Sequence, residues 1–363
     1  MPVDLSFLLP FLGTIFGIFF ILAVSFNIEY GYAGQPNLGK VFFYSVGGYA
    51  AATLTTRALW ALAGSPADIP FLEDAGGVVR FAVARANPAA IVGLFLASLV
   101  VAGLVGAAFG WLTSYPAIRL RGDFLAISLI AVGEVSRVFV LNYEPIAGGV
   151  FGLSGVPNPF SWLPPRVVDA VYAVVVLGIA FGVYVFAIRL TNSPFGRLLK
   201  SLRDDELASG VYGKDTPKVK ARALMIGSGM AGVAGALYVF YAQTAYAADF
   251  IPIVSFTAVT MVILGGVANH KGTLVGAAFM TLLDLVTRPV FPTLFDIYWR
   301  PPFDLNYVRY LAIGVIIIVV LMFRPKGLLP ERPVETSAVR VARRRVREIA
   351  RADPSGSPGT TLK

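Results

Sequence analysis

The sequence predicts an all-α, polytopic membrane protein with about nine transmembrane helices, interrupted by a broken helix near residues 29–38. Of its 363 residues, 56% are hydrophobic and only 14% are charged, whereas soluble domains carry about 25% charged residues. Long apolar runs recur along the chain, and about 20 mostly apolar residues are enough for a helix to cross a bilayer. Both observations favour lipid over water as the surroundings of this chain.

The apolar runs define nine candidate spans, and eight to ten are allowed because several runs are short or rich in glycine. The spans are 5–28, 38–56, 89–112, 124–141, 167–189, 219–243, 253–270, 273–291 and 306–323. The first run is longer than the core of a signal peptide and has no basic start, so we expect it to be retained.

Basic residues indicate how these spans are oriented. They concentrate in the loop after the fifth span and again from Arg324 onward. Because Lys and Arg favour cytoplasmic loops, the N-terminus is expected outside the cell membrane and the C-terminus inside. The loops near 60–88, 142–166 and 291–305 then lie outside. The net charge of +9 is explained by this orientation, so no nucleic-acid partner is expected.

The chain is expected to form one transmembrane domain, residues 1–330, followed by a basic, largely disordered cytoplasmic tail, residues 331–363. In the tail, arginines surround apolar residues at helical spacing. This pattern fits an amphipathic helix on anionic membrane lipid as well as it fits a solvated tail.

Residues 193–216, in the basic loop after the fifth span, carry the capping signals of two short helices. Ser193 suits the N-cap of the first helix and Pro194 its first turn. The acidic run that ends at Glu206 suits the start of the second helix, and Gly213 can end it in the left-handed conformation. The segment is therefore expected to be folded, either as a docking surface for a partner or as an ordinary charged loop.

Gly31, Gly34 and Pro36 interrupt sequence that is apolar on both sides and predict the broken helix. Transporters use such breaks to aim backbone dipoles at polar substrates, and non-helical backbone at membrane depth must face protein or a water-filled cavity. On this interpretation Gly31, Gly34, Gln35 and Asn37 lie on the substrate path. The same pattern fits a tight turn between two spans equally well.

Two pairs of opposite charges lie at helical spacing inside predicted spans: Glu134 with Arg137, and Asp284 with Arg288. Ionisable side chains in a membrane helix are costly and usually face the protein interior. Groups three or four residues apart can neutralise each other along one helix face, so a structural role is favoured over substrate contact.

Small residues recur every fourth position at Ala223, Gly227, Ala231 and Gly235. Such a ladder lets neighbouring membrane helices approach closely, so we expect it to serve packing and no chemistry.

Several kinds of chemistry are not expected. The chain has no Cys and one His, His270, so a disulfide is excluded and a metal site or other cofactor is not expected. There is no phosphate-binding G-x-x-x-x-G-K-[ST] loop, because Ala208 stands five residues before Gly213 and Asp215 follows Lys214. With no credible Ser/His pairing either, the chain is expected to be neither an ATPase nor another enzyme.

Short motifs along almost the whole spanning region resemble the LivM-type permeases of branched-chain amino-acid ABC importers, a family that also includes urea and amide permeases. The motifs are Gly31-Tyr32-Ala33-Gly34-Gln35 with Leu38-Gly39, Arg119-Leu120-Arg121-Gly122 with Glu134 and Arg137, Gly148-Gly149 with Gly152-Leu153 and Pro157, Ser193-Pro194-Phe195-Gly196-Arg197, Arg203-Asp204-Asp205-Glu206 with Gly213, Ala231-Gly232 with Ala234-Gly235-Ala236-Leu237-Tyr238, Gly265-Gly266, and Arg324-Pro325-Lys326-Gly327-Leu328. Each motif is weak alone, but their order along the chain is specific. Four residues depart from the pattern, since the family usually has Ser at Asn37, His at Lys40, an aromatic residue at Asp123 and Thr at Ser128.

The resemblance implies a transport subunit that pairs with a homologous second permease, two cytoplasmic ABC ATPases and an extracytoplasmic solute-binding protein. It implies that the ATPase-docking helix is formed by the residues of the second short helix and its flanks: Arg203, Asp204, Asp205, Glu206, Ala208 and Gly213.

The function that the resemblance implies is the translocation of branched-chain amino acids, or of similar small polar solutes such as urea and amides. A stand-alone secondary carrier is the alternative. A carrier would need ion-coupling carboxylates in its core, and the candidates for this role are Glu29, Glu134 and Asp284.

Overall fold

The computed structural model describes residues 5–66, 69–120, 123–287 and 305–331. The unit described below is Met1–Pro330, and the second unit of the chain is Glu331–Lys363. The predicted tail (331–363, apart from its first residue) and the predicted loop 291–305 (apart from its last) lie outside the described residues.

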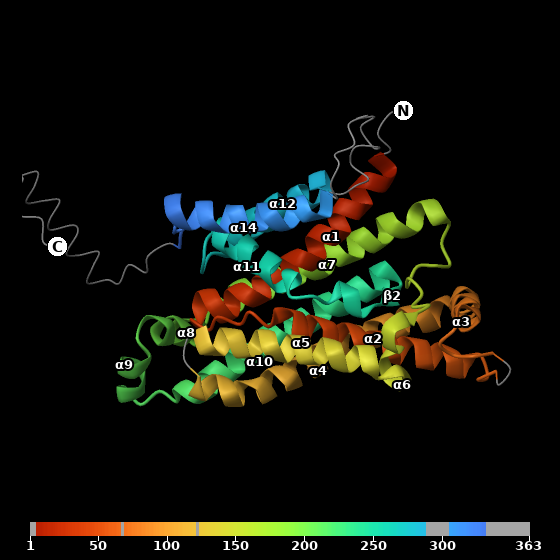
Figure 1. Cartoon of the computed structure of the whole chain (residues 1–363), viewed down its shortest axis with the longest axis horizontal. Coiled ribbons are helices and arrows are strands. Elements are labelled where there is room, and N and C mark those ends of the chain that lie inside the picture. The colour runs from red at the N-terminus through yellow and green to blue at the C-terminus, as the bar shows by residue number, and fades with distance from the viewer. Residues whose placement is uncertain (1–4, 67–68, 121–122, 288–304, 332–363) are drawn as a thin grey trace, which may run out of the picture. The chain divides into compact units, whose positions relative to one another are not determined.

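The described part of the first unit is built almost entirely of helices, most of which lie alongside one another (Figure 1). The long helices are α1 (Leu5–Phe26), α2 (Lys40–Leu62), α4 (Pro88–Arg119), α5 (Asp123–Asn142), α7 (Pro165–Asn192), α10 (Thr216–Ala242), α11 (Ile253–Gly265), α12 (His270–Thr287) and α14 (Leu305–Phe323). The shorter elements are η1 (Asn27–Tyr32), α3 (Asp74–Ala86), α6 (Glu144–Ala147), η2 (Gly149–Phe151), β1 (Leu153–Ser154), α8 (Pro194–Asp204), α9 (Glu206–Val211), β2 (Thr244–Ala245) and η3 (Ala247–Asp249). Each predicted span lies for the most part within one of these long helices, and the predicted all-α fold class is confirmed.

Six helices of the described residues are long and apolar enough to cross a membrane: α1 with η1, α4, α5, α7, α10, and η3 with α11. The predicted span 253–270 is too long, because α11 ends at Gly265 and α12 already begins at His270. Helix α11 ends early because of hydrogen bonds to residues far away in the sequence. The backbone amides of Leu328 and Leu329 donate to the carbonyls of Leu264 and Gly265, and so take up the free carbonyls at the end of α11.

Helix α10 is the most buried span, with 72% of the residues in its most apolar stretch buried, against 22% in α5. Its small residues let the neighbouring helices approach, as the ladder predicts. A Cβ on Gly235 would collide with the carbonyl of Tyr44 in α2, and one on Gly227 would collide with the side chain of Glu29. Only glycine therefore allows α1 and α2 to pack this closely against α10.

The unit has two ends, and different short helices lie at each of them. Helices α8 and α9 lie at one end, and α3 and α6 lie at the other (Figure 1). At the α3 end, the buried guanidinium of Arg80 donates hydrogen bonds to the carbonyls of Phe71, Ser154 and Gly155 at 2.7–3.1 Å. Arg80 thus holds the predicted loops 60–88 and 142–166 together, at the end opposite the segment 193–216.

Candidate functional site

The connection between α1 and α2 brings most of the predicted substrate-path residues into the protein interior. α1 continues through Asn27–Tyr32 as a π-helix, and the chain then turns before α2 begins at Lys40. Gly34 has φ +69°, in the left-handed region that favours glycine. Gln35 and Asn37 are buried. The interruption therefore joins two separate spans, and it lies at the end of the unit where α8 also lies.

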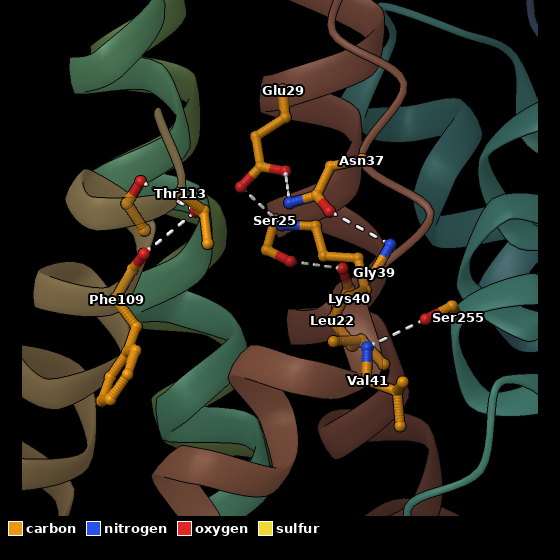
Figure 2. Close-up of polar contacts among 11 residues, drawn as sticks. Leu22, Ser25, Glu29, Asn37, Gly39, Lys40, Val41, Phe109, Thr113 and Ser255 are labelled. Carbon is orange, nitrogen blue, oxygen red and sulfur yellow. Dashed lines mark hydrogen bonds and ion pairs between the residues drawn. The ribbon is translucent and has the colours of Figure 1, made fainter. Parts of the chain in front are cut away.

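A buried network of polar side chains stabilises this connection (Figure 2). The ammonium of Lys40 lies 2.6 Å from Oε1 of Glu29, and both side chains are 0% exposed. This contact is an ion pair. The amide of Asn37 donates to Oε2 of Glu29 at 2.8 Å, and its oxygen accepts from the backbone amide of Gly39 at 3.2 Å. Two of the four residues that depart from the family pattern, Asn37 and Lys40, thus contact the same carboxylate.

Polar atoms around this network have no hydrogen-bond partner within the described chain. The side-chain amide of Gln35 makes no hydrogen bond through either its nitrogen or its oxygen, and the amide nitrogen of Asn27 makes none either. The oxygen of Asn27 accepts from the backbone amide of Ala268, 241 residues away in sequence. The connection is therefore tied to the α11–α12 turn while it retains unused hydrogen-bonding capacity.

Residues 193–216 fold as two short helices, as their capping signals predict. The hydroxyl of Ser193 accepts hydrogen bonds from the amides of Phe195 and Gly196 at the start of α8. The carboxylate of Asp205 accepts from the amide of Ala208 at 2.9 Å and caps α9. Gly213 has φ +75° after the end of α9, which is the left-handed ending expected from the sequence.

The α8–α9 segment contacts the connection between α1 and α2 through Arg203. Its Nη1 donates to the carbonyl of Gly31 at 2.8 Å, and its Nε pairs with Asp204 at 3.0 Å. A Cβ on Gly34 would lie only 3.1 Å from Cγ of Arg203, so glycine permits this approach. A cleft of about 590 Å³ lies between the two segments and is lined by Gln35 and Glu206, among others.

Helix α9 and its end also expose apolar side chains that were not among the predicted site residues. Leu207 is 75% exposed, Val211 is 87% exposed and Tyr212 is 83% exposed. Leu207 and Val211 are four residues apart and so lie on one face of this short helix. The signal that could have revealed them is their spacing inside an otherwise polar segment. Their exposure at the end of a well-capped helix is typical of a docking surface.

Glu134 and Arg137 form the predicted pair, but not in the chain's interior. Nε of Arg137 donates to both carboxylate oxygens of Glu134, at 2.9 and 3.1 Å, and Nη2 also contacts Oε1. Their side chains are 42% and 27% exposed, respectively. The prediction that this pair faces the protein interior was wrong for the single chain. Helix α5 packs mainly against α2, and the other faces of α5 are uncovered. The second predicted pair is untested, since Arg288 lies outside the described residues.

A second cavity, of about 1070 Å³, lies along α2 between α4 and α5. This cavity was not predicted from the sequence, because its walls come from three separate helices whose packing against one another has no local sequence pattern. The signal in the sequence was a row of polar residues at every fourth position of α2: Ser45, Tyr49, Thr53 and Arg57.

Taken together, these helices define a multi-pass integral membrane protein with two short, capped helices at one end. A family model described as the permease component of branched-chain amino acid transport systems matches residues 9–321. The chain belongs to this family.

Curated relatives match over most of the chain. The chain is 32% identical to the "Probable branched-chain amino acid transport permease protein LivM" of Methanocaldococcus jannaschii, over 88% of this chain and 93% of the relative. It is 27% identical to a LivM permease of Salmonella typhimurium described as part of a high-affinity branched-chain amino acid transport system, over 88% of this chain and 69% of that relative. A LivH permease of the same species is 22% identical, over 87% of this chain and 92% of the relative. No solved structure matches the chain.

Proposed function

We propose that this chain is the membrane-spanning permease subunit of an ATP-driven importer of branched-chain amino acids. It pairs with a homologous second permease, two cytoplasmic ABC ATPases and an extracytoplasmic solute-binding protein. The family match and the LivM and LivH relatives support this proposal.

The observation that carries the proposal is the α8–α9 segment. An importer subunit without a nucleotide site must receive energy through a contact, and α9 offers exposed apolar side chains at Leu207, Val211 and Tyr212. On its inner side the same segment contacts the α1–α2 connection through Arg203 and Gly31. When the ATPase displaces α9, the displacement therefore reaches the membrane-spanning helices through the folded α8–α9 segment, which we call the lever. Arg203, Asp204, Asp205, Glu206, Ala208 and Gly213 form or flank this lever.

This assignment makes the α8–α9 end cytoplasmic and the α3–α6 end external, so the N-terminus is outside and the C-terminus inside. The concentration of Lys and Arg between spans α7 and α10 supports this orientation. The α1–α2 connection then forms the inner end of the substrate path. Gly31, Gly34 and Gln35 lie beside the lever, and Asn37 acts through its hydrogen bond to Glu29.

The docking proposal is tested by co-purification of the ATPase with the permease complex from membranes. Val211→Asp places a charge in the proposed apolar contact and should abolish co-purification. Val78→Asp is the matched control, because Val78 is 68% exposed on α3 at the opposite end; it should leave co-purification unchanged. Normal recovery of the ATPase with the Val211 variant would contradict the docking role of α9.

The path proposal is tested by Asn37→Leu, which removes the amide that holds the Glu29 carboxylate. We expect ATP-driven uptake of leucine at limiting concentration to fall while the complex still assembles. Unchanged uptake would mean that the connection serves only as a turn between two spans.

A further inference from the structure

A cavity of about 510 Å³ at the α3 end of the unit is lined by charged and polar side chains as well as apolar ones. Helix α3 marks this end in Figure 1. The cavity lies between the end of α3, the segment 158–165, the start of α7 and Gln243, which follows α10. Its charged members are Arg85, in the last turn of α3, and Asp169, near the start of α7. We call it the Arg85–Asp169 cavity.

The two charged groups share this cavity without pairing with each other. Neither the guanidinium of Arg85 nor the carboxylate of Asp169 makes a hydrogen bond or an ion pair with another described residue. A guanidinium binds a carboxylate through two parallel hydrogen bonds, and a carboxylate accepts hydrogen bonds from an ammonium group. A ligand that carries one group of each sign therefore matches both residues. A plain anion or cation matches one of them and is repelled by the other.

Two buried neutral groups add hydrogen-bonding capacity to the same cavity. Asn158 is only 3% exposed, and its side-chain oxygen accepts from the backbone amide of Phe160 at 3.0 Å. Its side-chain nitrogen has no hydrogen-bond partner among the described residues, and the buried hydroxyl of Ser161 has none either. Buried polar groups without partners cost free energy unless a ligand or water completes them. Both observations point to an occupant with polar groups of its own.

Hydrogen bonds hold the walls of the cavity in place. The backbone amide of Ser161 donates to the carbonyl of Asn158 at 3.0 Å, and the amide of Val156 donates to the carbonyl of Gln243 at 3.0 Å. Arg80 ties α3 to the same loop through its hydrogen bonds to backbone carbonyls. A site whose walls are already ordered loses less entropy when a small ligand binds.

We propose that the Arg85–Asp169 cavity is an external entry site that receives a zwitterionic amino acid with an apolar side chain. Arg85 binds the α-carboxylate, and Asp169 binds the α-ammonium group. Asn158 donates a further hydrogen bond through its free amide nitrogen. This inference rests on the proposed function, which makes the α3 end external, and adds to it a site and its recognition chemistry. The apolar lining residues contact the ligand's side chain: Phe81, Trp162, Leu163, Pro165 and Val168.

Other small occupants match less of this cavity. A calcium or magnesium ion needs several oxygen ligands and usually more than one carboxylate, whereas Asp169 is the one carboxylate among the described lining residues. A lipid chain matches the apolar lining and leaves both charged groups unused. A free amino acid uses the guanidinium, the carboxylate and the apolar lining together.

The test is equilibrium binding of radiolabelled leucine to the purified permease–ATPase complex without the solute-binding protein. Arg85→Gln and Asp169→Asn should each weaken leucine binding by about tenfold, because each removes one charge-assisted contact. Asp74→Asn and Arg189→Gln are the matched controls. Asp74 is exposed on α3, Arg189 is exposed in the last turn of α7, and neither lines the cavity. Both control variants should bind leucine with normal affinity.

Two leucine analogues assign each charged contact. Leucinamide lacks the carboxylate, and isocaproate lacks the ammonium group. In competition with leucine, Asp169→Asn should weaken the binding of leucinamide and leave that of isocaproate unchanged, whereas Arg85→Gln should do the opposite. Such a pairing of ligand changes with residue changes isolates each direct contact. If both variants weaken both analogues equally, the assigned contacts are wrong.

The site proposal and the proposed function fail in distinguishable ways. If the unsubstituted complete complex shows no ATP-driven leucine uptake, the proposed function fails. If that complex is active, and either leucine does not bind without the binding protein or both variants bind it normally, the site proposal alone fails. If both variants bind leucine normally but lose stimulation of the ATPase by the binding protein, the two charges contact that protein and the site proposal is wrong. Each variant should keep the normal unfolding midpoint, because both side chains are exposed.

Discussion

The buried ion pair between Glu29 and Lys40 provides the sharpest test of how the α1–α2 connection is stabilised. Lys40→Met removes the ammonium and leaves the carboxylate with the Asn37 amide and no cation paired to it among the described residues. Breaking a buried pair by removing one partner costs about 3–5 kcal/mol, because the remaining charge stays desolvated. Both side chains are 0% exposed, so this buried-pair estimate applies without a discount for solvent screening.

The assay is thermal unfolding of the purified complex in detergent, in which a loss of this size lowers the midpoint by about 5 °C. Lys220→Met is the control. The ammonium of Lys220 lies at the same 2.6 Å from Glu206, but that carboxylate is 47% exposed, and a surface pair contributes about 0–1 kcal/mol. The double change Glu29→Leu with Lys40→Met should be milder than Lys40→Met alone, since no charge is stranded. The reasoning is refuted if Lys40→Met is no worse than Lys220→Met, or if the double variant loses as much as the two single changes together.

Three further predictions concern the two ends of the unit and α5. Ser154→Cys should be labelled by an impermeant reagent from outside the cell only, and labelling from the inside alone would overturn the orientation. Glu134→Ala leaves the guanidinium of Arg137 without its carboxylate partner on the uncovered side of α5. This variant should therefore lower the yield of assembled complex more than a double change of both residues to apolar ones. A double variant whose yield is as low as the losses of the two single variants combined would contradict the pairing. Gly213→Pro cannot adopt the φ of +75° found there, so it should weaken ATPase recovery on affinity purification, whereas undiminished recovery would show that the end of α9 does not matter for docking.

Local signals predicted the helices well, because they depend on residues close together in sequence. Ser193 and Asp205 cap the two short helices, as their positions before each helix suggest. Glu134 and Arg137 contact each other because residues three apart on a helix are neighbours. Their exposure could not be foreseen, since it depends on which helices cover α5.

The candidate site depends on contacts that have no local signature. Arg203 and Gly31 are 172 residues apart, and the pairing of Glu29 with Lys40 requires the turn that reverses the chain between them. The early end of α11 likewise depends on Leu328 and Leu329, which follow the last described span. The polar residues at every fourth position of α2, from Ser45 to Arg57, are apparent in the sequence, but the sequence does not show that α4 and α5 lie beside them.

The most direct test of how ATPase movement reaches the membrane-spanning helices is a measurement in proteoliposomes that contain the complete complex. The quantity to measure is the number of leucine molecules taken up per ATP hydrolysed. Arg203→Gln removes the hydrogen bond from α8 to the carbonyl of Gly31 and leaves the exposed face of α9 in place. Arg197→Gln is the control, an exposed arginine on the same helix. We expect the Arg203 variant still to bind the ATPase and hydrolyse ATP while its uptake per ATP falls, and we expect the control to keep the normal ratio. An unchanged ratio in the Arg203 variant would contradict the claim that ATPase movement reaches the spans through this contact.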